Sequence, residues 1–189
     1  AATVGEGALL PETYHFSLGD SRSEIVGRMI AAREAALARL WEGREKGLPL
    51  RTPDEALVLA SIVERETAVP AERARVAAVF INRLNRGMRL QSDPTVAYGL
   101  ELEGGPLDRP LLRRDLEVDH PYNTYVHRGL PPGPIVNPGM ASIAAVLAPA
   151  KTDELYFVAD GTGGHAFAKT LAEHNRNVAR WRRLQREQR

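Results

Sequence analysis

Two glutamates near the middle of the chain are the residues best suited to chemistry. Glu64 and Glu66 follow an apolar run, residues 56–63, in which Ser61 is the only polar residue. Pro70 disfavours helical geometry at the residue before it, so both glutamates are expected in the last turn of a helix. Burial and the negative end of the helix dipole both raise the pKa of a carboxyl placed there. An acid that stays protonated near neutral pH is what general acid catalysis requires, above all for cleaving glycosidic bonds.

Helical spacing does not choose between the two glutamates. Residues two apart do not share a helix face, so at most one of them points squarely into a given cleft. For both glutamates, the preceding residues on the same face of the helix are apolar. The alternative interpretation is a solvated pair of glutamates that binds nearby arginines, namely Arg65, Arg73 or Arg75.

Two polar segments could work with such an acid. In residues 91–98, Asp93 could serve as a second carboxylate, either as a nucleophile or as an activator of water; the alternative is an Asp-Pro turn with an N-cap. In residues 122–125, two tyrosines flank Asn123 and Thr124. Ring faces stack on sugars and amides bond to them, so this segment suits a glycan; the alternative is a strand edge that fills the core.

Other chemistries lack support in the sequence. The chain has no cysteine, which excludes disulfides and thiol catalysis, and its five histidines show no metal-ligand spacing. We expect no metal and no cofactor. The net charge of +1 indicates no nucleic-acid partner. The last helix is rich in arginine, which we interpret as a solvated basic face, with nucleic-acid binding as the alternative; the residues are Arg176, Arg180, Arg182, Arg183, Arg186 and Arg189.

The helices that must position these residues are marked by their starts. Ser21, Thr52 and Thr170 are each followed three residues later by glutamate, the pattern of a capping box. The first of these helices should end near residues 43–47, and the last should run to the C-terminus. A further helix should begin at about Ala71 and end at Gly87, a residue suited to a left-handed cap.

The rest of the chain predicts a β-hairpin and a long loop. Residues 155–159 and 165–167 read as two strands joined by a turn. The glycine-rich turn lacks the Lys-Ser/Thr of a phosphate-binding loop. Residues 8–16 are expected to be extended, and residues 99–139 to be a Pro/Gly-rich loop region without a long periodic segment. The predicted fold class is α+β: a helix-rich single domain with a C-terminal β-hairpin, spanning residues 1–189.

Several long motifs, in order, resemble the YceG/MltG family of endolytic murein transglycosylases. They are EGALLPETY, LASIVERETAVPAERARVAAVFINRL, GMRLQSDPTVAYG, YNTYVHRGLPPGPIVNPG and LYFVADGTGGHAF. The first departs slightly from the family pattern, since Glu12 stands where Asp is commoner. The resemblance covers nearly the whole chain and adds to the expectations drawn from the residues.

The resemblance implies a substrate, a product and a location. Such proteins cleave the MurNAc–GlcNAc β-1,4 bond of peptidoglycan strands and leave 1,6-anhydro-MurNAc ends. The resemblance also implies cell-wall synthases, the penicillin-binding proteins, as partners. It implies a single-pass anchor in the bacterial cell membrane, with the catalytic domain on the extracytoplasmic (periplasmic) side. The anchor and a LysM-like subdomain would precede Ala1, since this chain contains no apolar run of membrane-spanning length.

The resemblance also assigns roles. The essential glutamate of the family pattern falls on Glu66, and Glu66-Thr67 is similar to the Glu-Ser of a lysozyme-like active-site helix. Glu64 would then support Glu66 as a hydrogen-bond or charge partner. The rival functions are a hydrolase that uses Glu66 with Asp93 and a non-catalytic peptidoglycan-binding module. The expected site has Glu66 as the catalytic residue and these substrate-binding residues: Glu64, Gln91, Ser92, Asp93, Thr95, Tyr122, Asn123, Thr124 and Tyr125.

Overall fold

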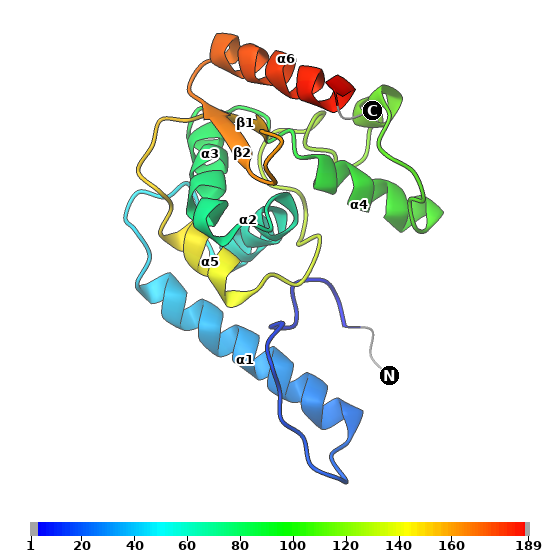
Figure 1. The fold of residues 1–189 in the computed structure, drawn as a ribbon. Coiled ribbons are helices and arrows are strands. Elements are labelled where there is room, and N and C mark those ends of the chain that lie inside the picture. The colour runs from blue at the N-terminus through cyan, green and yellow to red at the C-terminus, as the bar shows by residue number, and fades with distance from the viewer. Residues whose placement is uncertain (1–3, 188–189) are drawn as a thin grey trace.

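Helix α2 (Pro53–Glu66) lies at the centre of the computed structural model, which describes residues 4–187 (Figure 1). Helices α3 (Arg73–Asn85) and α5 (Met140–Leu147) pack against it, and α1 (Arg22–Glu42) crosses beside α5. The remaining elements are η1 (Pro70–Glu72), α4 (Asp93–Gly104), η2 (Arg113–Glu117), β1 (Tyr156–Ala159), β2 (His165–Ala168) and α6 (Leu171–Glu187). The predicted helix-rich α+β class is confirmed.

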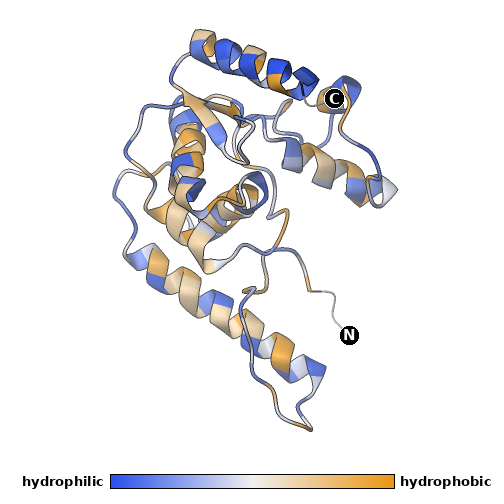
Figure 2. Ribbon diagram, in the orientation of Figure 1, coloured by the Kyte–Doolittle hydropathy of each residue, from blue (hydrophilic) through white to orange (hydrophobic). Residues whose placement is uncertain are grey.

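The core forms around α2, whose residues 56–63 are all buried. Leu59 and Ile62 are 0% exposed, and they share one hydrophobic cluster with Phe80 of α3 and Ile143 of α5. Each fully buried side chain of this size contributes about 1.5–3 kcal/mol. Apolar colour accordingly dominates α2 and α5, whereas α6 is largely hydrophilic (Figure 2). The core fixes α2, so the end of that helix has a defined position.

The helix starts follow the capping pattern with one difference. The boxes at Ser21 and Thr170 are complete, with side chain and backbone bonded in both directions. At α2, Thr52 accepts the backbone N–H of Glu55, but the Glu55 carboxylate binds the backbone N–H and guanidinium of Arg51. The predicted box at Thr52 is therefore only half formed, because a neighbouring arginine attracts the carboxylate more strongly than the cap backbone.

Helix α3 ends as predicted. Gly87 has φ of +62°, and its N–H donates to the Leu84 carbonyl at 3.0 Å. The Met88 N–H donates to the Arg83 carbonyl at 2.9 Å. These two bonds form a Schellman cap, in which glycine takes the left-handed position without steric cost. The helix begins at Arg73, two residues later than expected, because η1 occupies the first turn.

The expectation of a long loop without regular structure is wrong. Helix α4 runs to Gly104 and η2 follows it, so residues 99–139 are not free of regular structure. A glycine inside a helix suggests a break, but a Cβ on Gly99 would lie 2.5 Å from Nδ1 of His120. Glycine there permits close packing rather than ending the helix. Residues 8–16 form neither a helix nor a strand, and the Leu10 N–H donates to the Met29 carbonyl of α1 at 3.2 Å.

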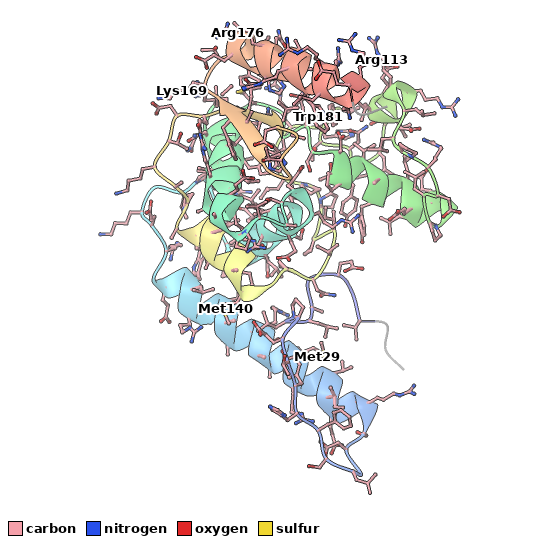
Figure 3. All side chains as sticks on the ribbon, viewed as in Figure 1. Met29, Arg113, Met140, Lys169, Arg176 and Trp181 are labelled. Atoms are coloured by element: carbon pink, nitrogen blue, oxygen red, sulfur yellow. The ribbon has the colours of Figure 1, made fainter. Side chains whose placement is uncertain are left out.

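The predicted hairpin is confirmed and is covered by α6. Strands β1 and β2 are antiparallel, with Phe157 opposite Phe167. Trp181 lies on the side of α6 that faces the hairpin, whereas Arg176 points outward (Figure 3). Arg189, the last of the arginines named above, lies outside the described residues. Within residues 4–187, none of the helices combines the length and the apolar character needed to cross a membrane.

Candidate active site

A cavity of about 320 Å³ opens at the C-terminal end of α2. Its walls come from the ends of α2 and α3, the start of α4, the hairpin and α6. The lining residues are Glu66, Arg83, Leu90, Gln91, Asp93, Tyr125, Phe157, Val158, Ala159, His165 and His174. Four of the predicted site residues therefore share one cavity, together with groups that the motif analysis did not select.

Glu66 is the last residue of α2 and the central acid of this cavity. Burial raises the pKa of its carboxyl to about 7, and the charge of Asp93 acts in the same direction. Against this, Ser92 Oγ–H donates to Oε1 of Glu66 at 2.5 Å, and the charge of Arg83 favours the ionised form, as does His165 when its ring carries a proton on both nitrogens. Desolvation prevails over these stabilising contacts. A carboxyl with this pKa can both release and accept a proton near neutral pH.

Ser92 is held in place by two buried threonines. Its backbone N–H donates to Thr124 Oγ1 at 3.0 Å, and the hydroxyls of Thr124 and Thr95 lie 2.8 Å apart. The Gln91 N–H donates to the Thr124 carbonyl at 3.1 Å. Thr95 and Thr124, both predicted to bind substrate, are buried beneath the cavity and do not line it. Their position supports the loop that carries Ser92.

Gln91 lines the cavity in a strained backbone conformation. Its φ of +51° makes it the one non-glycine residue in the left-handed region within residues 4–187. Such a conformation costs about 1–3 kcal/mol and persists where the surroundings impose it, often at functional sites. The backbone bond to Thr124 supplies part of that constraint.

Asp93 and Tyr125 form a pair at the rim. Tyr125 O–H donates to Asp93 Oδ1 at 2.5 Å, and both side chains border the cavity. Burial, followed by this hydrogen bond, raises the pKa of Tyr125, so its hydroxyl stays a donor. Asp93 begins α4 but makes no side-chain cap, which sets aside the simple N-cap interpretation.

Tyr122 and Asn123 lie outside the lining of this cavity. The Tyr122 ring packs on Tyr98 with centroids 4.8 Å apart. The Asn123 amide donates to the carbonyls of Val118, at 2.7 Å, and Leu116, at 3.2 Å. Asn123 is 1% exposed, so its polar atoms are used within the protein. The segment forms a turn that holds the loop region, not the strand edge considered as an alternative.

Glu64 points toward α5, not into the cavity of Glu66. Its Oε2 accepts the backbone N–H of Gly139 at 3.0 Å and the hydroxyl of Ser142 at 2.6 Å. Gly139 is the N-cap of α5, so the carboxylate sits at the positive end of that helix. The carboxylate that raises the pKa of Glu66 is Asp93, and the expected partnership of Glu64 with Glu66 finds no contact here.

Three basic residues of the cavity were missed as site candidates. Arg83 donates from Nε to the Leu155 carbonyl and from Nη1 to the Leu90 carbonyl, both at 2.6 Å. The helical spacing of Arg83 with the core residues Val76 and Phe80 indicates a side chain that points toward the protein interior. The other two are His165 and His174, whose spacing in the sequence excludes a metal site but does not indicate a place in the cavity.

His174 lies on α6, and its ring stacks on Tyr156 at 5.2 Å between centroids. Burial, then the charge of Arg83, lowers the pKa of His174, which favours a neutral ring at neutral pH. Across residues 4–187, no group of three or more potential ligand side chains is placed to hold a metal ion.

Fold and cavity together define a class: a helix-rich α+β domain built around one glutamate of raised pKa at the end of a buried helix. The chain belongs to the YceG-like family, whose sequence model matches residues 1–180. A crystal structure of a yceG-like protein from Listeria monocytogenes superposes with a TM-score of 0.75 and 41% identity. That match covers 90% of this chain and 54% of the other.

Two relatives carry the name endolytic murein transglycosylase. The protein from Bacillus subtilis (strain 168) is 42% identical over 171 residues, which are 90% of this chain and 46% of the relative. The protein from Streptococcus pneumoniae serotype 2 (strain D39 / NCTC 7466) is 37% identical over 177 residues, 92% of this chain and 32% of the relative. This chain thus spans less than half the length of either relative.

Proposed function

We propose that this chain is the catalytic part of an endolytic murein transglycosylase. It would cleave MurNAc–GlcNAc β-1,4 bonds within peptidoglycan strands and leave 1,6-anhydro-MurNAc ends, as a carbon–oxygen lyase. The observation that carries this proposal is the partly buried Glu66 carboxyl, whose pKa is raised to about 7, in a cavity with polar walls. The names of the relatives support the reaction class.

The proposed mechanism uses one acid twice. Protonated Glu66 donates its proton to the glycosidic oxygen, and the bond to C1 breaks. The N-acetyl group of the substrate stabilises the oxocarbenium-like centre. Ionised Glu66 then takes the proton of the MurNAc C6 hydroxyl as that oxygen attacks C1. No water is consumed. A pKa near neutral pH serves both steps, and the Ser92 hydroxyl stabilises the carboxylate between them.

A hydrolase that uses two carboxylates is the second candidate, favoured by the presence of Asp93 in the same cavity. Asp93 would then act as nucleophile or as activator of water. Its hydrogen bond from Tyr125 and its effect on the pKa of Glu66 fit a supporting role better. The two mechanisms give different products, since an anhydro end lacks one water relative to a reducing end.

The test is digestion of purified murein with the chain and with Glu66→Gln, followed by mass analysis of the fragments. The wild type should release anhydro-ended fragments, and Glu66→Gln should release almost none while keeping its fold. Glu64→Gln is the matched control, with the same chemical change two residues away. Reducing ends would support the hydrolase, an inert wild type would support a non-catalytic binding module, and a fully active Glu66→Gln would show that Glu66 is not the catalytic acid.

For the whole protein we propose the setting that the resemblance implies. It would be held in the bacterial cell membrane by a single upstream span, with a LysM-like subdomain before this catalytic domain. The active site would face the extracytoplasmic side, where its peptidoglycan substrate lies. Penicillin-binding synthases would be its partners. The greater length of the relatives supports a protein with further segments.

A further inference from the structure

Glu72 and His165 form a hydrogen-bonded pair beside the cavity. Glu72 lies in η1, six residues after Glu66, and His165 opens strand β2. Oε1 of Glu72 accepts the backbone N–H of His165 at 2.9 Å, and Oε2 lies 2.8 Å from Nδ1 of the same residue. Both side chains are mostly buried, at 16% exposure for His165 and 19% for Glu72. One carboxylate therefore fixes both the backbone and the ring of His165.

This pairing determines which ring nitrogen carries the proton. An ionised carboxylate only accepts hydrogen bonds, so Nδ1 must be the donor. In the neutral ring, Nε2 is then an acceptor. Among residues 4–187, none is hydrogen-bonded to Nε2. Nε2, the ring nitrogen that the pair leaves free, is therefore a hydrogen-bond acceptor when the ring is neutral.

The same ring borders the cavity that holds Glu66. His165 is one of the lining residues, whereas Glu72 is not. Because Nδ1 is bonded to Glu72, Nε2 is the ring nitrogen that remains available to a molecule bound in the cavity. Phe157 meets the ring at 84° with centroids 5.2 Å apart, which limits rotation. A Cβ on Gly164 would lie 2.8 Å from Oε1 of Glu72, so glycine there allows the close approach.

We propose that His165 binds the glycan through Nε2, accepting a hydrogen bond from a sugar hydroxyl or an acetamido N–H. Glu72 is the positioning residue that selects the tautomer and the orientation of this ring. The proposal rests on the proposed function, because it takes the occupant of the cavity to be a glycan. It adds a substrate contact from the hairpin to the cavity that Glu66 and Asp93 also line.

Two substitutions separate this role from a structural one. His165→Asn keeps an N–H donor near the position of Nδ1 and removes the nitrogen that faces the cavity. Glu72→Gln keeps an oxygen for the backbone N–H but presents an amide N–H to Nδ1, which forces the proton onto Nε2. His127→Asn is the matched control, since His127 pairs with Asp119 at 2.9 Å but does not line the cavity.

The experiment combines murein digestion with ¹⁵N NMR of the histidine rings at mildly alkaline pH. His165→Asn and Glu72→Gln should each lower kcat/KM about 10- to 100-fold with little change in melting temperature, while His127→Asn should match the wild type. In the wild type, Nδ1 of His165 should be protonated and Nε2 should shift when N-acetylglucosamine oligomers are added. In Glu72→Gln the proton should move to Nε2.

Wild-type kcat/KM in His165→Asn, or a wild-type ring with its proton on Nε2, would overturn the proposal. If His165→Asn fails to fold, the ring titration in the wild type decides, and an Nε2 signal that does not respond to the oligomers counts against the contact. An inactive wild type would defeat the proposed function instead. The tautomer measurement does not depend on activity, so the two failures are distinguishable.

Discussion

The last turn of α2 has two sides, and the carboxylates on them have opposite surroundings. On the α5 side, Glu64 meets a backbone N–H and a hydroxyl at the start of a helix. On the cavity side, Glu66 meets one hydroxyl donor, the like charge of Asp93 and little solvent. Two carboxylates in one helix turn thus lie in opposite surroundings, and desolvation, with the like charge of Asp93, is what raises the pKa of Glu66.

The largest expected effect is the difference in activity between a substitution of Glu66 and the same substitution of Glu64. Glu66→Gln should lower kcat/KM by about 10²–10⁴, because the amide cannot donate and retake a proton. Glu64→Gln should stay within a few-fold of the wild type, since that side chain is turned away from the cavity. Fragment release from murein measures both. Equal losses would mean that the two sides act as one unit and would remove the distinction.

A second prediction concerns the dependence of stability on pH. The pKa of Glu66 is raised from 4.5 to about 7 in the folded protein, so its protonated form is the one that folding favours. Its contribution is fully present below the unfolded pKa and is lost as pH rises through about 7. Relative to Glu66→Gln, the wild type should lose roughly 3 kcal/mol of unfolding free energy between about pH 4 and pH 8. Urea unfolding at several pH values measures this difference, and parallel curves would contradict it.

Stability should fall instead when the α5 side is changed. Glu64→Ala leaves the Gly139 N–H and the Ser142 hydroxyl without their acceptor, at a cost of about 2 kcal/mol. Ser142→Ala removes only one donor and should cost about 1 kcal/mol. Denaturant midpoints at neutral pH provide the measurement. An unchanged midpoint in Glu64→Ala would show that this contact does not secure α5.

The smallest expected effect concerns the influence of Asp93 on the pKa of Glu66. Asp93 raises the pKa of Glu66, so Asp93→Asn should lower it. The acid then loses its proton at lower pH, and the high-pH limb of the activity profile should move downward by a fraction of a pH unit. The pH dependence of kcat/KM is the measurement. Asp119→Asn, a change at an exposed carboxylate, is the control and should shift nothing.

Abolished activity in Asp93→Asn would point to a nucleophile or a water activator, and thus to the hydrolase. A modest loss with a shifted profile would agree with the supporting role proposed for Asp93. The two outcomes differ in size as well as in pH dependence, so a single series of rates separates them.

Local patterns predicted much of this fold, because caps and hairpins depend on residues close in sequence. The Schellman cap at Gly87 and the boxes at Ser21 and Thr170 are of this kind. The extent of α4 was missed because Gly99 reads as a breaker, and only its contact with His120 explains it.

The site was predicted less completely because its contacts join residues that lie far apart in the sequence. The partners of Glu64 lie 75 and 78 residues away, and no periodicity links them. His165 and His174 reach the cavity from the hairpin and α6, two elements that are remote from α2 in sequence. Glu66 itself was chosen by resemblance, and the pKa that supports the choice comes from the folded surroundings.

Arg83 has a consequence for the width of the cavity. Its guanidinium donates to the Leu90 carbonyl, just before Gln91, and to the Leu155 carbonyl, just before β1, so one rigid planar group joins two walls of the cavity. The distance between these two parts of the cavity wall therefore depends on the length of a single side chain. Lysine, with one point of attachment, would release one wall. If the cavity binds a glycan as proposed, that change would alter which sugar rings fit.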